Sequence, residues 1–228
     1  MLYTLENVRD NLRTREGKRV FFLGAGDNLT SAARDFLKEQ RIPILPAENA
    51  KITRYETLDG GFLEEKPEHL TQLTGNLLVP KTHPRIVFRG KLDTLEAELI
   101  LAQLDAPRVQ EQLEEVLALT RKIVACEVLG EPVQLETLCG MTEAEVRKRS
   151  HFPADYYGQP HFMPSYRDGR AIARLNRART AAREAELAAC AAFRDREAGC
   201  SRRDILQALN RISSVLYLMM IQEKGRNQ

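Results

Sequence analysis

Two helical segments within residues 168–222 constrain the fold more than any other part of the chain. Apolar residues recur at helical spacing through both segments, and a break near Gly199 allows them to fold back as an antiparallel pair. The apolar stripe of the first segment consists of Leu175, Ala182, Ala189 and Phe193. The second segment is apolar on nearly all sides, so we expect it to be buried inside a helical bundle.

Polar residues also fall on faces of this helix pair that should be buried. Arg179, Arg183 and Glu186 lie within roughly 60° of one another at the edge of the apolar stripe. The polar strip of the second segment consists of Asn210, Ser213, Ser214 and Tyr217. Because buried polar groups need partners, two interpretations stay open. The strips form a site for a charged ligand, or they form an Arg–Glu–Asn network that only locks the two helices together.

Composition limits the possible functions. The chain has 228 residues, of which 43% are hydrophobic and 29% charged, and its formal net charge is +2. This balance gives no general surface for nucleic acid or membranes. We find no signal-peptide pattern and no apolar run of the roughly 20 residues that a membrane span needs. The four cysteines are too scattered for a zinc site or a disulfide framework, so we expect a cytoplasmic protein with reduced thiols.

The segment 18–45 has the pattern of a strand, a helix and a second strand. KRVFFL and IPIL are the expected strands, and Thr30 is placed to cap the helix between them. Gly24 and Gly26 after the first strand could indicate a dinucleotide-binding loop. However, Leu29 occupies the position of the third glycine, so a tight loop in an accessory unit is the favoured interpretation.

The next segment, 46–80, shows little periodicity. Its sequences DGG and EEKPEHLTQLTGN are typical of loops, so we expect an irregular region here. Helical periodicity begins at about Pro84, since proline suits the first turn of a helix. Two amphipathic helices are predicted, one ending near Leu104 and one covering 108–129.

A long excursion at 130–167 interrupts the helical pattern. It is rich in proline, aromatic residues and histidine, and Thr142 with Glu145 predicts one short capped helix within it. A loop of this length is usually a lid or a binding segment, and the alternative is a packed surface loop. A second capping box, formed by Ser201 and Asp204, is expected to start the last helix.

Together these patterns predict a mainly α protein with an up-and-down helical bundle and a small N-terminal α/β unit. We expect the α/β unit and a loop on the nucleotide side at 1–80. We expect the helical bundle at 81–228, with the 130–167 excursion as a long loop insertion.

Three sequence motifs then point to a family. RTAAREAE resembles the Arg-x-x-x-Arg-x-x-Glu signature of ATP:corrinoid adenosyltransferases, and LNRISSVLYL resembles their Leu-Asn-Arg-Leu-Ser-x-x-Leu signature. KTHPRIVFRGKLDTLEAEL is similar to their first-helix signature. The residues in register with these signatures are Lys81, Gly90, Asp93, Arg179, Arg183, Glu186, Asn210, Arg211 and Ser213. The matches cover roughly residues 80–222, and the HPRI and SHFP sequences look most like the ethanolamine-utilisation branch.

This resemblance implies an activity and its partners. The family transfers the 5′-deoxyadenosyl group of ATP to reduced cobalamin, reached through four-coordinate cob(II)alamin, with Mg²⁺ bound to the nucleotide. Cobalt(I) attacks the ribose C5′ and the polyphosphate leaves. The resemblance further implies a homo-oligomer, with a trimer favoured, whose active sites lie between subunits. A flavin-dependent reductase, an adenosylcobalamin-dependent lyase and a bacterial microcompartment are the partners that it suggests.

The resemblance also implies roles for individual residues. The residues expected at the ATP are Lys66, Lys81, Arg183, Glu184, Glu186 and Asn210. Arg183 suits the polyphosphate because a guanidinium matches phosphate oxygens, and Glu186 suits Mg²⁺. Asp93 is expected to pair with Arg179 at the subunit interface, as a positional ion pair beside the catalytic Arg183. The residues expected at the corrinoid are Phe152, Phe162, Ser213, Ser214 and Tyr217, and one phenylalanine is expected to exclude the lower axial ligand.

The chain departs from the family pattern in three ways. The family's Thr-Gly-Asp-x-Gly loop is absent, and we expect DGGFLEEKPEH to take its place with Lys66 as its cation. No cysteine precedes Cys126, so we expect no His and Cys-Cys-x-x-Cys metal site. Ser214 stands where an aspartate is common. Two alternatives therefore stay open: a non-catalytic protein that delivers a corrinoid or nucleotide, and a structural protein of a microcompartment.

Overall fold

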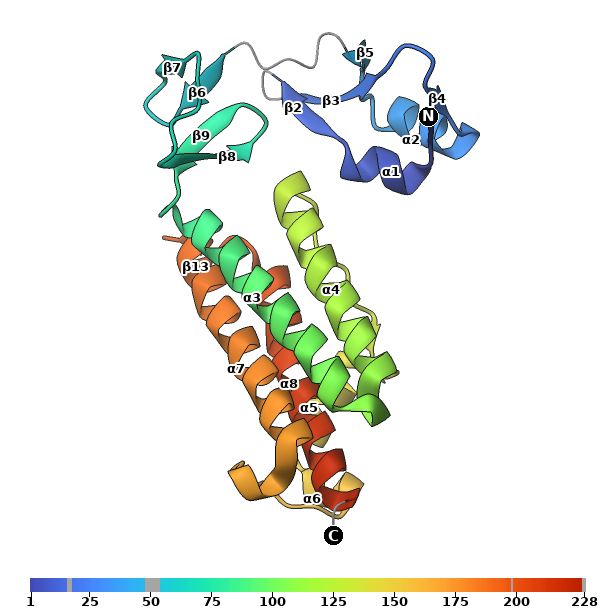
Figure 1. Ribbon diagram of the computed structural model, residues 1–228, viewed down its shortest axis with the longest axis vertical. Coiled ribbons are helices and arrows are strands. Elements are labelled where there is room, and N and C mark those ends of the chain that lie inside the picture. Colours follow the sequence, from blue (N-terminus) through green and yellow to red (C-terminus); the bar gives the residue numbers. More distant parts are fainter. Residues whose placement is uncertain (16–17, 48–53, 198, 227–228) are drawn as a thin grey trace. The chain divides into compact units, whose positions relative to one another are not determined.

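The computed structural model of the protein describes residues 1–15, 18–47, 54–197 and 199–226. The chain divides into two compact units, 1–83 and 84–228, and each is considered by itself (Figure 1). Within the described residues, no helix is both long enough and apolar enough to cross a membrane.

The first unit begins with a small α/β arrangement. Its elements are β1 (Leu2–Tyr3), α1 (Leu5–Asp10), β2 (Arg13–Arg15), β3 (Lys18–Leu23), β4 (Asn28–Leu29), α2 (Ser31–Glu39) and β5 (Ile44–Pro46). Strands β3 and β5 are parallel neighbours joined through α2, and β2 pairs with β3 on its other side. The Thr30 hydroxyl accepts a hydrogen bond from the Ala33 N–H, so the expected cap and the strand–helix–strand order are confirmed.

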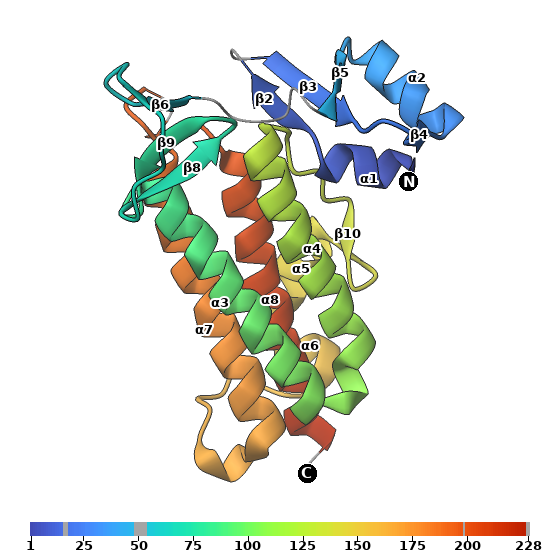
Figure 2. The ribbon, with the colours of Figure 1, turned by 45° about the horizontal axis from the view of Figure 1, so that its top comes forward.

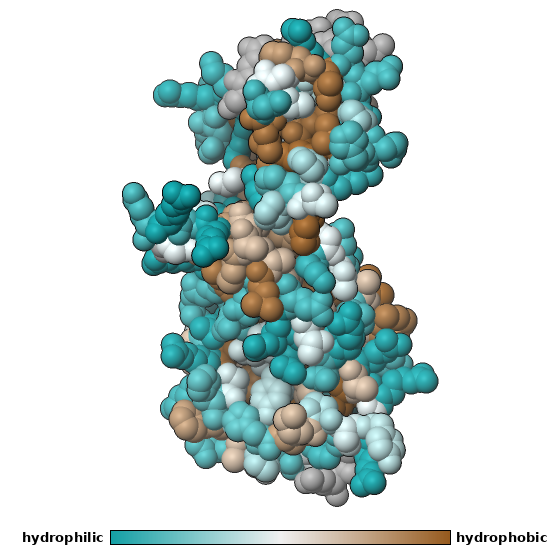
Figure 3. Space-filling model, turned by 90° about the vertical axis from the view of Figure 1, so that its left-hand side faces the viewer, coloured by the Kyte–Doolittle hydropathy of each residue, from teal (hydrophilic) through white to brown (hydrophobic). Residues whose placement is uncertain are grey.

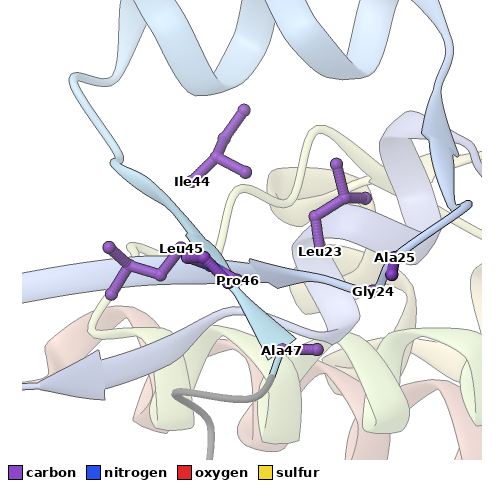
Figure 4. A pocket seen from close by; sticks show the side chains of 7 residues that line it. All are labelled: Leu23, Gly24, Ala25, Ile44, Leu45, Pro46 and Ala47. Carbon is purple, nitrogen blue, oxygen red and sulfur yellow. The ribbon is translucent and has the colours of Figure 1, made fainter.

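The loop after β3 is a tight turn beside an apolar hollow. Gly26 has φ +85°, a conformation that favours glycine. A hollow of about 390 Å³ opens at the carboxyl ends of β3 and β5, and Figure 4 shows the seven residues that line it. The lining consists of Leu23, Gly24, Ala25, Ile44, Leu45, Pro46 and Ala47. Apolar surface is also visible on this unit in Figure 3. None of the lining side chains carries a charge with which to hold a phosphate.

A second sheet completes the first unit and corrects one expectation. Its strands are β6 (Tyr55–Thr57), β7 (Phe62–Leu63), β8 (Leu70–Thr74) and β9 (Leu77–Pro80), in the order β7-β6-β9-β8. We expected loops here, and that prediction was wrong over these strands. Each strand is only two to five residues long, too short for an alternating pattern to stand out from its turns.

The second unit is built on four long helices. They are α3 (Pro84–Asp105), α4 (Gln110–Leu129), α7 (Gly169–Ala192) and α8 (Arg203–Arg226). Helix α3 packs against α4 and α7, and α7 packs against α8, with the four helices side by side in both ribbon views (Figures 1 and 2). The turn between α7 and α8 is a short hairpin of β12 (Arg194–Asp195) and β13 (Gly199–Cys200), in which Gly199 has φ +74°. The predicted up-and-down bundle is confirmed.

The bundle core consists of the apolar stripes of these helices. The predicted stripe of α7 is buried along its whole length, and the Phe193 ring packs edge-on against Phe88 at 5.5 Å. The leucines that α3 contributes to the core are Leu92, Leu95 and Leu99. Burying each such side chain contributes about 1.5–3 kcal/mol, so the core fixes the positions of the helix faces that carry polar groups.

The excursion between α4 and α7 is more ordered than we expected. It contains β10 (Thr137–Leu138), β11 (Met141–Thr142), α5 (Glu143–His151), α6 (Pro153–Tyr157) and a 3₁₀ turn (Tyr166–Asp168). The capping box of Thr142 and Glu145 is confirmed at the start of α5. A single helix was predicted, but two form because Pro153 cannot continue α5 and instead begins α6. Both helices pack against α8.

The capping box predicted for Ser201 and Asp204 is wrong. Helix α8 begins at Arg203, so Ser201 lies one residue outside the cap position. The Ser201 hydroxyl donates to the Phe193 carbonyl, which closes the hairpin. The Asp204 carboxylate pairs with Arg202 at 2.8 Å and accepts the Val133 N–H at 2.8 Å, so it ties the excursion to α8.

Candidate functional site

The two predicted polar strips meet where α7 and α8 pack in antiparallel fashion. We call this group the polar cluster; it comprises Arg179, Arg183, Glu186, Asn210, Ser213, Ser214 and Tyr217. Asn210 Nδ2 donates to Glu186 Oε1 at 3.3 Å, which joins the two helices directly. The hydroxyls of Ser213 and Ser214 donate to the Asn210 carbonyl, at 2.9 and 3.0 Å. The serine hydroxyls therefore make their hydrogen bonds within α8, while the side-chain amide nitrogen of Asn210 faces α7.

The two arginines of the cluster lack an acidic partner. Both Nε and Nη2 of Arg179 donate to Asn176 Oδ1, at 3.1 and 2.9 Å, and that amide is neutral. Arg183 is exposed and makes no hydrogen bond or ion pair within the described part of the chain. Burial, together with the nearby Arg183 charge, lowers the pKa of Arg179. Two close guanidinium groups, neither in ion-pair contact with a described carboxylate, form a region of positive charge that attracts an anion.

The far end of the cluster is aromatic. The Phe162 ring stacks near Tyr217 with a centroid distance of 6.5 Å, and the His161 ring stacks on Tyr217 at 5.6 Å. His161 Nδ1 lies 2.8 Å from the Tyr217 hydroxyl. Phe152 is 57% exposed and has its ring contact with His151 instead. The structure therefore brings Phe162 to the cluster, together with His161, to which the sequence interpretation gave no role.

Glu184 is separated from the cluster. Its carboxylate lies 2.8 Å from Lys91 Nζ on α3 and 3.4 Å from Arg177, and the Lys91 hydrogen bond lowers its pKa. Residues two apart on a helix point in nearly opposite directions, so Glu184 faces α3 while Glu186 faces the polar cluster of the same chain. The role of Glu184 at the ATP stays a prediction.

Asp93 and Arg179 are not brought together within one chain. Asp93 is exposed on α3 and has no ion pair among the residues that the structure describes. Every other charged side chain of α3 pairs with a residue on α4 or α7 in that part of the chain. The expected pair between Asp93 and Arg179 therefore stays a prediction.

Lys66 and Lys81 belong to the first unit, whereas the polar cluster belongs to the second. The Lys81 N–H donates to the His69 carbonyl at 3.1 Å, and its ammonium lies 3.8 Å from Glu68. Lys66 is exposed on the same segment between β7 and β8. Both lysines thus lie beside strands of the second small sheet, Lys66 between β7 and β8 and Lys81 directly after β9.

Arg211 is a polar residue of this region to which the motif analysis gave no role. Its Nη2 donates to Glu143 at 2.9 Å, and its Nη1 donates to Asn210 Oδ1 at 3.3 Å. Its side chain is only 11% exposed. Its sequence signal was a charged residue next to the polar strip, in a helix segment that is apolar on nearly all other sides.

Residues 62–223 match the family model described as cobalamin adenosyltransferase. The chain belongs to the cobalamin adenosyltransferase family. The three motifs, with all seven residues of the polar cluster, lie inside the matched range.

Two relatives agree with the family model. The corrinoid adenosyltransferase EutT of Salmonella typhimurium is 32% identical over 238 residues, covering 94% of this chain and 89% of the relative. The protein of the same name from Escherichia coli K12 is 37% identical over 158 residues, covering 69% of this chain and 59% of the relative. The similarity to the Salmonella protein thus includes most of the first unit of this adenosyltransferase.

Glu186 is the acidic side chain of the polar cluster. Asn210 engages one of its carboxylate oxygens, and the other accepts no hydrogen bond from a described residue. No group of three or more His, Cys, Asp or Glu within the described ranges is arranged to hold a metal ion. A single carboxylate is nevertheless a donor set that fits Mg²⁺, which is commonly held by one or two carboxylates together with substrate phosphates.

Proposed function

We propose that the polar cluster between α7 and α8 binds the ATP of a corrinoid adenosyltransferase. The chain forms adenosylcobalamin from ATP and a reduced corrinoid, as its family membership supports. In this reaction a cobalt–carbon bond forms at the ribose C5′, and the C5′–O bond to the polyphosphate breaks. The polyphosphate leaves with the electron pair of the broken bond. The relatives' name supports a role in ethanolamine utilisation.

The unpaired Arg183 beside Arg179 is the observation that carries this proposal. A leaving polyphosphate is highly anionic, so its departure needs positive charge held in place before the reaction. Arg183 supplies that charge because no carboxylate among the described residues neutralises it. Its planar guanidinium matches two phosphate oxygens at once.

Glu186 and Asn210 then act on the nucleotide from the other side of the cluster. Glu186 would hold Mg²⁺ with its free oxygen, directly or through water, and the metal would neutralise phosphate charge. Asn210 has a second N–H that is not needed by Glu186, and this donor is directed to the nucleotide.

Two further parts of the site come from outside the cluster. Asp93 pairs with Arg179 of a second copy, since each is without an ionic partner in the described part of one chain. This contact would place the active site between subunits of a trimer. Lys66 and Lys81 stay candidate phosphate ligands in place of the missing glycine-rich loop, as the family resemblance implies.

The corrinoid lies on the aromatic side, against Tyr217, Ser213 and Ser214. Phe162 is the stronger candidate to exclude the lower axial ligand, because it is half-buried and stacks near Tyr217. Phe152 would border the corrinoid from the exposed side. A flavin-dependent reductase would supply the electron for cobalt(I), and an adenosylcobalamin-dependent lyase, within a microcompartment, would take the product.

The test is formation of adenosylcobalamin by the purified protein with MgATP and chemically reduced cobalamin, followed by its absorption spectrum. We expect turnover. Tight binding of adenosylcobalamin without turnover would instead favour a delivery protein. Titration calorimetry that shows binding of neither ATP nor corrinoid would favour a structural protein.

A further inference from the structure

A chain of hydrogen bonds runs from the excursion into the polar cluster. It begins at Glu143, the first residue of α5, whose carboxylate accepts from Arg211 Nη2 at 2.9 Å and from Gln207. It continues from Arg211 Nη1 to Asn210 Oδ1, and from Asn210 Nδ2 to Glu186 Oε1, both at 3.3 Å. Three helices, α5, α8 and α7, are thereby connected by four side chains.

The chemistry of this chain fixes the orientation of the amide. A guanidinium has only donors, so the oxygen of Asn210 must face Arg211. The amide nitrogen must then face Glu186, because an ionised carboxylate only accepts hydrogen bonds and needs a donor opposite it. If the amide turned over, two oxygens would face each other at Glu186, and a donor would face a donor at Arg211.

The guanidinium itself is held in place at a cost. The Arg211 Nε is buried and has no hydrogen-bond partner within the described residues. Leaving such a donor unsatisfied is unfavourable, because it has lost its hydrogen bonds to water. The two Nη contacts therefore set the position of this side chain. Of their two partners, Glu143 is charged and Asn210 is neutral. The Arg211 hydrogen bond also lowers the pKa of Glu143.

We propose that Glu143 and Arg211 are positioning residues that fix the Asn210 amide and, through it, the Glu186 carboxylate in the orientation that receives MgATP. Neither residue touches the substrate. This inference rests on the proposed function of the cluster and assigns a role to α5, since the excursion orients the nucleotide side of the site. The two contacts at 3.3 Å are long, and they are expected to shorten when the nucleotide binds.

Glu143→Ala tests the inference against a purely structural role. We expect kcat/KM for ATP to fall about 10- to 100-fold, with a higher Mg²⁺ concentration at half-maximal rate. Glu143→Gln keeps one acceptor oxygen and should lie between Ala and wild type. Arg211→Lys should also lose activity, although the positive charge is kept. A lysine ammonium lacks the forked guanidinium that contacts Glu143 and Asn210 at the same time.

Glu145→Ala is the matched control. It removes the capping box at the same end of α5 without touching Arg211. Losing the Glu145 half of the capping box weakens the start of α5, so the variant would reproduce the effect of Glu143→Ala if Glu143 only stabilised this helix. We expect Glu145→Ala to lower the melting temperature and leave the Mg²⁺ requirement unchanged.

A double-mutant cycle with Asn210→Ala closes the test. If Glu143 acts through Asn210, Glu143→Ala should have no further effect on ATP affinity in the Asn210→Ala background. Titration calorimetry measures this affinity even where turnover is slow. Additive effects, or a Glu145→Ala variant that matches Glu143→Ala, would overturn the inference. A wild-type protein without adenosylcobalamin formation would instead contradict the proposed function.

Discussion

The charges on α3 and the charges between α7 and α8 are arranged in opposite ways. On α3, Arg85 and Arg89 share the fully buried carboxylate of Glu127, and Lys91 pairs with Glu184. Between α7 and α8, Arg179 has only an amide partner and Arg183 has none among the described residues. Both regions are rich in arginine and glutamate, but only one leaves positive charge unmatched.

This difference separates structural ion pairs from a binding site. A matched pair gains little from an incoming anion, because its own carboxylate already occupies the guanidinium. An unmatched guanidinium close to another one costs free energy until an anion arrives. Glu184 and Glu186 illustrate the distinction on a single helix, since they are two residues apart and belong to different regions.

Arg183→Ala should have the largest effect on activity. Removing a group that stabilises charge in the transition state costs about 10²- to 10³-fold in kcat, or about 2.7–4 kcal/mol. Arg177→Ala is the control on the same helix, because Arg177 is matched by Glu98 and Glu184. The rate of adenosylcobalamin formation should fall for the first and stay nearly unchanged for the second. Equal losses in both would remove the distinction between the two regions.

Glu127→Ala should have the largest effect on stability. Its carboxylate is fully buried between Arg85 and Arg89, and breaking a buried ion pair costs about 3–5 kcal/mol. We expect the lower end of that range, because both arginines are partly exposed and can reach water. Urea unfolding measures the change. A loss below about 1 kcal/mol, as for a surface pair, would contradict this assignment.

Glu186→Gln and Glu184→Gln form the next comparison. The first should raise the Mg²⁺ concentration needed for half-maximal activity by about 10- to 100-fold. The second should leave it unchanged, since Glu184 faces Lys91 on α3. Metal titration of the initial rate is the measurement. An identical response in both variants would return Glu184 to the nucleotide site.

Lys91→Ala should have the smallest effect. Its ion pair with Glu184 is about 40% exposed on both sides, so water and salt screen it. We expect a loss of about 0.2–1 kcal/mol in the free energy of unfolding and no change in the rate. A large loss of activity would mean that the α3 network reaches the active site.

Long periodic segments allowed most of the second unit to be predicted from the sequence. The stripe of Leu175, Ala182 and Ala189 specified the buried face of α7, and the bundle followed from it. The strands of the second small sheet were missed because they are too short to show a period. The split of the excursion into two helices was also missed, since Pro153 can end one helix and begin another.

The helix faces of the candidate site could be predicted from the sequence, whereas the partners of its charged side chains could not. Helical spacing placed Arg179, Arg183 and Glu186 on one face, and the structure keeps them there. Spacing could not show which charges already have partners, because those partners are distant in sequence: Glu184 lies 93 residues from Lys91. Nor could it reveal Glu143, which reaches Arg211 from a helix 68 residues away.

Binding of ATP and of adenosine to wild type, Arg183→Ala and Arg177→Ala tests the central claim most directly. Titration calorimetry with Mg²⁺ present needs no reduced corrinoid. We expect Arg183→Ala to lose ATP affinity while it keeps the adenosine affinity of wild type, and Arg177→Ala to match wild type for both ligands. Unchanged ATP affinity in Arg183→Ala would contradict the assignment of the unmatched arginine to the polyphosphate.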